Sequence, residues 1–280
     1  MIPGDAARTD ALGRVHPPAG HDARIVCLVP SITELLFDLG LDAQIVGRTG
    51  FCIHPRDKVK SVPKVGGTKD VNIGRVRELA PTHLIVNIDE NEKPTVDALA
   101  EFVPNVVVTH PKAPLDNLGL YRLLGGIFGR AAAAEDLCRR FSVECERTSA
   151  ACAGLPRGRV LYLIWKDPWM TVSRDTYVSR TLALVGWDTV EVAGSERYPK
   201  IQLTPELLSG VDRVLLSSEP YAFREKHLEE VRNLLLPVTR YPSPVTVSLI
   251  DGEMTSWYGS RAIAGLRYLR GLRSDELSRA

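Results

Sequence analysis

The sequence predicts an α/β protein of two Rossmann-like lobes, each built on a parallel sheet, with one long helix joining them. Three observations support this fold class. Short apolar runs alternate with amphipathic segments, which is typical of parallel strands connected by helices. The alternation stops after Pro114 and restarts at Arg159. Between these points, residues 131–153 contain no Gly or Pro and carry apolar side chains at helical spacing.

The first half opens with a β-α-β unit. The apolar runs 24–29 and 44–47 are typical of buried parallel strands. The sequence from Ser31 to Glu34 has the Ser-x-x-Glu spacing of a capping box, which predicts a helix ending near Gly40. The other elements predicted in this half are helices over 73–79 and 95–102 and strands over 83–86 and 105–108.

The second half repeats the rhythm after the long helix over 131–153, which we interpret as a strut between lobes. The predicted strands are 159–164, 189–192, 213–216 and 245–250, and the predicted helices are 177–185, 205–208, 226–235 and 259–272. Residues 71–86 and 202–216 share one order of elements, a weak internal repeat. The predicted divisions are a disordered leader (1–22), an N-terminal lobe (23–113), a linking region (114–154) and a C-terminal lobe (155–280).

Composition excludes several classes of protein. The chain has 280 residues, is 44% hydrophobic and carries a net charge of +1, so it lacks the basic excess of a nucleic-acid-binding protein. No apolar stretch reaches the roughly 18–20 residues that a membrane span needs. The first 22 residues lack the apolar core of a signal peptide. We therefore expect a monomer that is cytoplasmic as written, or periplasmic if a leader was removed.

The cysteines and short motifs give no evidence of an enzyme. Five cysteines without a CxxC motif argue against a disulfide framework. Cys138, Cys145 and Cys152 recur every seven residues, about 10 Å along a helix, which is too far apart to share an ion. The chain contains no GxGxxG, GxxxxGK[ST], HExxH or GxSxG motif. We predict no catalytic residues.

Aromatic and polar residues collect in the segments that follow the predicted strands. Ligands of open parallel sheets bind beyond the carboxyl ends of the strands, so these segments define a candidate ligand cleft between the lobes. The predicted ligand-binding residues are Phe51, Cys52, His54, Glu90, Asn91, Trp165, Trp169, Glu219, Tyr221, Glu253, Trp257 and Tyr258. The aromatic rings offer stacking against a flat ligand, and the polar groups offer orientation.

Cys52 and His54 could also ligate a metal ion. A thiolate and an imidazole are soft ligands, and Glu90 or Glu219 could add a carboxylate from another loop. A Cys-x-His pair supplies only two of the four ligands of a structural zinc site. The alternative interpretation is a histidine in a turn before proline, and both interpretations stay open.

Several of these segments resemble one family. The sequence from Ile25 to Leu36, the segment from Gly40 to Gly47 and the segment from Ile73 to Ile85 resemble the vitamin B12 and iron-siderophore substrate-binding proteins of ABC importers. The resemblance covers about residues 24–272. A narrower subgroup of helical-backbone metal receptors is similar in further motifs, which are residues 51–55, 65–69, 167–176, 218–221 and 251–261.

The resemblance implies two lobes on a rigid helical backbone, with cobalamin or another metal chelate as the ligand, and transport as the role. It also implies an ABC permease as partner, which docks on one exposed carboxylate per lobe. Glu206 matches that position in the second lobe, whereas Gly74 stands at the matching place in the first. The aromatic residues of the expected cleft come mainly from the second lobe.

Two other functions stay open at this point. One is a cytosolic metal- or cofactor-handling protein, or an enzyme, on the same scaffold, with Cys52, His54 and Glu90 as its reactive set. Fold alone does not distinguish this from binding. The other is a partner-binding protein without a small ligand. The leading prediction is a solute-binding protein that holds a corrinoid, haem or chelated metal.

Overall fold

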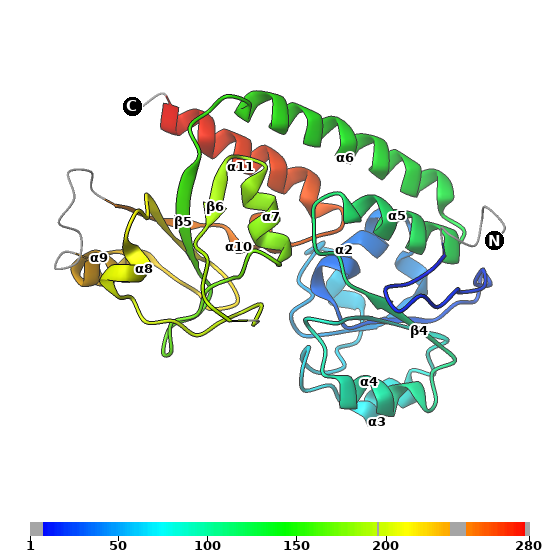
Figure 1. Ribbon diagram of the computed structural model, residues 1–280. Coiled ribbons are helices and arrows are strands. Elements are labelled where there is room, and N and C mark those ends of the chain that lie inside the picture. Colours follow the sequence, from blue (N-terminus) through cyan, green and yellow to red (C-terminus); the bar gives the residue numbers. More distant parts are fainter. Residues whose placement is uncertain (1–7, 195, 236–244, 278–280) are drawn as a thin grey trace. The chain divides into compact units, whose positions relative to one another are not determined.

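The computed structural model describes residues 8–194, 196–235 and 245–277, and it has an α/β fold with two parallel sheets (Figure 1). The first sheet has the order β2-β1-β3-β4 and the second the order β6-β5-β7-β8. All six strand pairings are parallel. The two sheets therefore have the same topology, which confirms the predicted fold class and agrees with the weak internal repeat.

The chain forms two compact units. The first runs to Pro111 and also takes in Leu115–Phe141 and Tyr258–Arg261, and the second comprises Lys112–Pro114, Ser142–Trp257 and the residues from Ala262 onward. Each unit contains one of the sheets. Helix α6 (Ala131–Cys152) is continuous, which confirms the long helix predicted over 131–153. The boundary between the two units falls inside this helix.

In unit 1 the sheet is covered on both faces. Its strands are β1 (Ile25–Cys27), β2 (Ile45–Arg48), β3 (His83–Asn87) and β4 (Asn105–Thr109). Helices α3 (Ile73–Glu78) and α4 (Lys93–Ala100) lie against one face, and α2 (Pro30–Asp38) and α5 (Asp116–Ile127) lie on the other (Figure 1). Short 3-10 turns occur at η1 (Asp42–Gln44) and η2 (Val59–Ser61). Strands β1 and β3 are buried along their whole length, as expected for central parallel strands.

In unit 2 the sheet likewise separates two apolar layers. Its strands are β5 (Gly158–Leu163), β6 (Trp187–Thr189), β7 (Arg213–Ser217) and β8 (Thr246–Ile250). Its helices are α7 (Tyr177–Ala183), α8 (Pro205–Leu208), α9 (Glu225–Leu235), α10 (Gly252–Ser256) and α11 (Arg261–Leu277), although the first residue of α11 belongs to unit 1. Leu182 of α7 and Leu269 of α11 pack on one layer, and Leu208 of α8 and Val231 of α9 pack on the other.

The predicted disordered leader is wrong for the residues that the structure describes. Asp10 is buried and its carboxylate accepts hydrogen bonds from the backbone amides of Leu12, Arg14 and Val108 and from the ring of His16. The amide of Ala11 also donates to the Val108 carbonyl oxygen at 2.9 Å. Residues 8–16 therefore form an arm that covers β4, the edge strand of the first sheet; residues 1–7 lie outside the described part.

The predicted capping box is also wrong. Helix α2 begins at Pro30, whose fixed φ and missing N–H suit the first helical position, and Val29 is the N-cap without a side-chain hydrogen bond. Ser31 is therefore inside the helix, and its hydroxyl is buried without a hydrogen-bond partner. Glu34 does not cap the helix but forms a two-pronged ion pair with Arg261, at 2.6 and 2.7 Å, within unit 1.

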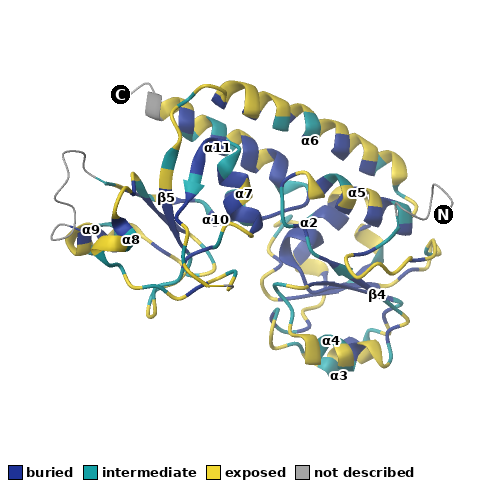
Figure 2. Ribbon diagram, viewed as in Figure 1, coloured by how far each residue is buried: buried dark blue, intermediate teal, exposed yellow. Residues whose placement is uncertain are grey.

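Other differences are small. The strand predicted at 189–192 is β6 at Trp187–Thr189, and helices α5 and α10 lie where no helix was predicted. The buried stripe of α6 is visible in Figure 2, and it includes Glu144 and Thr148, whereas Cys145 is only half-buried. Within the described residues, no helix is both long enough and apolar enough to cross a lipid bilayer.

Candidate ligand-binding site

Unit 2 holds a group of aromatic side chains in the loops that follow β5 and β7. Trp165 packs edge-on against Tyr221 with ring centroids 5.5 Å apart, and Trp169 stacks parallel to Phe223 at 6.2 Å. Tyr221 and Phe223 are 4.7 Å apart, which joins the two pairs. The structure thus brings together three predicted site residues, Trp165, Trp169 and Tyr221, with Phe223, which was not among the predicted residues. These four residues are called the aromatic group below.

The aromatic group presents one ring to solvent on a rigid base. Trp165 is 40% exposed, whereas Phe223 is 4% exposed. The turn that carries both tryptophans is fixed by two backbone hydrogen bonds, from Met170 to Trp165 and from Ile164 to Met170. An exposed ring that is held in place loses little conformational freedom when a flat ligand stacks on it.

His227 of helix α9 supports this base. It is buried, and burial lowers the pKa of its imidazole, so the ring is neutral. Its Nδ1 accepts a hydrogen bond from the Arg224 amide at 2.9 Å, which places the ring proton on Nε2, 3.4 Å from the Tyr221 hydroxyl. Sequence reasoning missed His227 because its role depends on packing against rings from another loop.

Glu219 and Trp257, both predicted ligand-binding residues, bond to one another. The indole Nε1 of Trp257 donates to Glu219 Oε1 at 2.6 Å, and the hydroxyl of Ser256 donates to the same oxygen at 3.1 Å. Trp257 is only 8% exposed. Burial raises the pKa of Glu219 to about 7, and the nearby carboxylates Glu253 and Asp251 act in the same direction, against the two hydrogen bonds. Glu219 and Trp257 thus form an internal pair in unit 2.

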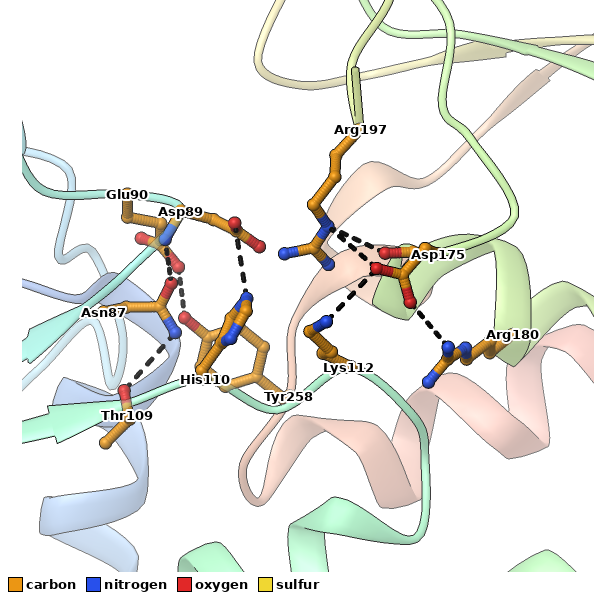
Figure 3. Close-up of polar contacts among 10 residues, drawn as sticks. All are labelled: Asn87, Asp89, Glu90, Thr109, His110, Lys112, Asp175, Arg180, Arg197 and Tyr258. Carbon is orange, nitrogen blue, oxygen red and sulfur yellow. Dashed lines mark hydrogen bonds and ion pairs between the residues drawn. The ribbon is translucent and has the colours of Figure 1, made fainter. Parts of the chain in front are cut away.

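In unit 1 the carboxyl ends of β3 and β4 carry a polar group (Figure 3). Glu90 accepts a short hydrogen bond from the Tyr258 hydroxyl, and the side-chain amide of Asn87 donates to Thr109 Oγ1 at 3.3 Å. Asp89 lies 3.5 Å from His110 Nε2. The sequence singled out Glu90 and Tyr258, and the structure brings both into one contact.

Asn91 has a different position from the one expected of a ligand-binding residue. Its side-chain nitrogen donates to the carbonyl oxygens of Leu28 and Thr68 at 3.3 and 3.0 Å, and its side-chain oxygen accepts from the backbone amide of Asn87 at 2.8 Å. These bonds tie three loops of unit 1 together. The side chain of Asn91 therefore holds these loops together.

The loop after β2 places its predicted residues in different environments. Phe51 is 62% exposed and offers a second aromatic face, this one on unit 1. Cys52 is fully buried, and its sulfur is 3.2 Å from the hydroxyls of both Thr33 and Thr49. Burial raises the pKa of the Cys52 thiol, so it stays protonated and is a poor metal ligand.

The described residues contain no cluster of three or more His, Cys, Asp or Glu side chains arranged to hold a metal ion. Cys52 and His54 therefore belong to no such cluster in this part of the chain, and the Cys52 thiol points into a buried pair of threonines.

A cluster of cations in unit 2 was not among the predicted site residues. The carboxylate of Asp175 lies within 3.2 Å of Lys112 Nζ, 2.6 Å of Arg180 and 4.0 Å of Arg197 (Figure 3). The hydrogen bond from Lys112 is the main cause that lowers the pKa of Asp175. Asp175 lies in the loop between β5 and α7. The rule that ligands bind beyond the carboxyl ends of parallel strands would have located Asp175 if it had been applied to this whole loop.

Two parallel sheets of equal topology, with aromatic and polar loops at their carboxyl ends, define a bilobal α/β binding protein as the class. Residues 25–202 match the family described as Periplasmic binding protein, and the chain belongs to that family. This confirms the resemblance stated from the sequence motifs.

Curated relatives and solved structures are similar over most of the chain. The vitamin B12-binding proteins of Vibrio vulnificus (strain CMCP6) and Pectobacterium carotovorum are 20% and 21% identical over 201 and 199 residues, which cover 72% and 70% of this chain and 72% of each relative. The periplasmic vitamin B12 binding protein of Vibrio cholerae superposes with a TM-score of 0.76 at 15% identity, covering 90% of this chain and 96% of that one.

A periplasmic heme binding protein from Pseudomonas aeruginosa superposes with a TM-score of 0.74 at 20% identity, covering 89% of this chain and 91% of that one. At these identities the likeness of the structures establishes the fold. The names of these proteins differ in ligand while the fold stays the same, so the ligand must be argued from the loops of this chain.

Proposed function

We propose that this protein is a solute-binding protein of an ABC importer and that its ligand is a corrinoid, a haem or another chelated metal, with a flat macrocycle favoured. The aromatic group of unit 2 carries the proposal. It presents the exposed Trp165 on a base of packed rings, and such a surface suits stacking on a planar macrocycle. The names of the curated relatives and of the solved structures, vitamin B12 and heme binding proteins, support the same class of ligand.

We propose that some of the predicted site residues contact the ligand and that others support the loops. Phe51, Trp165, Trp169 and Tyr221 would provide aromatic contacts, and Glu90, Glu253 and Tyr258 would provide polar ones. Cys52, Asn91, Glu219 and Trp257 are engaged within their own units and would support the loops. The cleft between the lobes stays a prediction.

A spectroscopic titration tests this proposal. Purified protein is titrated separately with cyanocobalamin, haemin and a ferric siderophore, and binding is followed by the absorbance of the ligand and by calorimetry. We expect one of the three to bind, and Trp165→Ala to weaken it about tenfold, as expected for the loss of one stacking ring. Trp165→Phe should retain most of the affinity because it keeps a ring.

The matched control is Leu234→Ala. Leu234 is another exposed apolar side chain of unit 2, 45% exposed on helix α9, and outside the aromatic group. It should leave the affinity unchanged. Absence of binding with all three ligands, or equal weakening by Leu234→Ala, would contradict the proposal.

His54 is the proposed axial ligand of the chelated metal. A chelated metal already has its equatorial ligands, so a single imidazole is sufficient, and the lack of a cluster of three ligating side chains does not bear on this role. The expected result for His54→Ala is a changed visible spectrum of the haemin complex with the aromatic contacts intact. An unchanged spectrum would remove His54 from the site.

We propose further that the protein has no catalytic role and works outside the cytoplasmic membrane with a permease. The family and the solved structures are named as periplasmic binding proteins. Glu206, exposed at the start of helix α8, is the proposed docking carboxylate of unit 2. Fractionation of cells that express the natural gene tests the compartment.

A further inference from the structure

A pocket in unit 1 is lined by four cationic side chains and by no carboxylate. It has a volume of about 320 Å³ and lies at the carboxyl end of β2, lined in part by the loop that follows this strand. Its lining residues include Arg48, Arg56, Lys60 and Lys64. None of these residues belongs to the aromatic group or to the polar group of Figure 3. This set of four cations is called the basic pocket below.

Arg48 is the buried member of the basic pocket. It is 5% exposed, and its guanidinium donates to two backbone carbonyl oxygens, those of Val59 and Thr49, each at 3.1 Å. Within the described residues no carboxylate pairs with it. Two neutral carbonyl groups solvate the cation but do not neutralise it, and a buried charge without a counter-charge is costly.

Cys52 also lines the basic pocket. It is fully buried, and its sulfur is 3.2 Å from the hydroxyls of both Thr33 and Thr49. The charged side chains that line the pocket are therefore the four cations alone.

The backbone fixes the exposed cations around Arg48. Lys64 forms a parallel bridge directly opposite Arg48, held by the hydrogen bonds from the Arg48 amide to Pro63 at 3.0 Å and from the Val65 amide to Arg48 at 2.8 Å. Like charges in opposed positions repel. Lys60 lies in the 3-10 turn η2, and the Val59 carbonyl that Arg48 binds belongs to the same turn.

One nearby acidic residue, Asp42, is paired outside the pocket. Asp42 pairs with Lys58 at 2.7 Å, and Lys58 does not line the pocket. In the described part of the chain, Arg56, Lys60 and Lys64 have no carboxylate partner. The fold thus brings four like charges together around a cavity, at a cost that a bound anion would offset.

We propose that the basic pocket binds an oxyanion of the carboxylate or phosphate class. A guanidinium fork binds such groups through two parallel hydrogen bonds, and the two lysines add point charges at the rim. The anion has two sources, a free anion from solution or an acidic group on a larger ligand. The site is separate from the aromatic group, so it does not depend on the proposed function.

Inorganic phosphate and citrate are the probes for the test. Each is titrated by calorimetry into the full chain at constant ionic strength, so that general screening is the same throughout. We expect saturable binding of at least one of them. Lys60→Gln together with Lys64→Gln should weaken it about tenfold or more, as expected for the loss of charged hydrogen bonds. Both lysines are exposed, so the variant should fold.

The matched control is Lys69→Gln together with Lys93→Gln. It removes the same charge from the same unit, at exposed lysines that pair with Glu92 and Asp97 outside the pocket. The control should bind the anion as wild type does. No saturable binding of either probe, or equal weakening in the control, would overturn the proposal.

A competition experiment distinguishes the two sources. Haemin carries two carboxylates, and its dimethyl ester carries none. If phosphate weakens the binding of haemin but not that of the ester, the pocket holds the acidic group of the ligand. If phosphate and haemin bind independently, the pocket holds a free anion. If haemin does not bind, the proposed haem ligand fails while the phosphate result still decides the pocket.

Discussion

At the scale of single residues, Glu219 is a buried carboxyl group whose pKa is raised by its surroundings. Its oxygen accepts hydrogen bonds from Trp257 and Ser256, yet burial and the neighbouring carboxylates raise its pKa to about 7. Between about pH 4.5 and pH 7, Glu219 is therefore mostly protonated in the native state and mostly ionised in the unfolded state. In that window the free energy of unfolding falls as the pH rises.

Replacing Glu219 by Gln tests this linkage. The variant cannot titrate at this position, so we expect its free energy of unfolding to rise relative to wild type between about pH 5 and pH 8, on the order of 2 kcal/mol. Urea unfolding at both pH values measures the difference. Glu229→Gln, at an exposed glutamate of the same unit, should show no such change. A Glu219→Gln difference that is constant with pH would contradict the prediction.

Gly252 is a second residue-scale case. A Cβ atom there would lie 2.5 Å from Glu219 Cγ and 2.6 Å from Ser217 Oγ, so helix α10 can approach this loop only with glycine. We expect Gly252→Ala to lower the free energy of unfolding by about 1–3 kcal/mol because the loop must move. Thermal and urea unfolding measure it.

Gly271, exposed in helix α11, is the matched control for Gly252. A Cβ atom there meets nothing within 4 Å. Alanine is a better helix former than glycine, so Gly271→Ala should raise the free energy of unfolding by about 0.5–1 kcal/mol. Two changes of the same sign would show that the close approach at Gly252 is not the cause.

At the scale of elements, the buried stripe of α6 includes one charge. Glu144 is almost fully buried, and its carboxylate accepts hydrogen bonds from Arg267 at 2.7 Å and from Arg270, both on α11. Although burial raises it, these two hydrogen bonds hold the pKa of Glu144 below its ordinary value. Its stabilisation is therefore present at neutral pH and lost as the pH falls through the pKa of the folded state.

Glu144→Gln should cost about 2–4 kcal/mol at neutral pH, because two arginines lose their counter-charge in a desolvated contact. Glu135, on the same helix, pairs with Arg122 at an exposed position, so Glu135→Gln should cost less than about 1 kcal/mol. Urea unfolding at neutral and acidic pH measures both variants. Equal costs would show that burial does not decide the strength of these ion pairs.

The elements were largely predictable because their periodicity is local. The apolar runs of β1, β3 and β7 and the breaker-free α6 follow directly from the sequence. Helix α10 has five residues and begins at a glycine, and it was not predicted, whereas the four-residue helix α8, which begins at a proline, was. The partners of Glu144 were not predictable, because they are more than 120 residues away in the chain.

The candidate site was predictable in location more than in side-chain direction. The rule that ligand loops follow parallel strands located Trp165, Trp169 and Tyr221. It could not tell that Trp257 turns toward Glu219, or that Cys52 points at Thr33, because these directions depend on tertiary packing. The basic pocket was missed for the same reason, since its cations come from a strand, a turn and a bridge.

At the scale of the whole molecule, the proposed import role makes Glu206 testable apart from ligand binding. Glu206→Gln should leave the affinity for the ligand unchanged and reduce ligand uptake by cells that contain the cognate permease, because one docking ion pair is lost. Glu225→Gln, at another exposed glutamate of unit 2, is the control. Normal uptake with Glu206→Gln would separate this residue from docking.

The arm of residues 8–16 determines how the chain behaves when it is shortened. A chain that starts after His16 would leave the backbone of β4 without the bonds from Ala11 and Asp10. An open strand edge pairs readily with the edge of another copy. Pairing of β4 with β4 of a second copy would close as a dimer, whereas pairing of β4 with the other edge strand, β2, would continue from copy to copy. Removal of this arm would therefore promote self-association of the protein, even where the affinity for a ligand is unchanged.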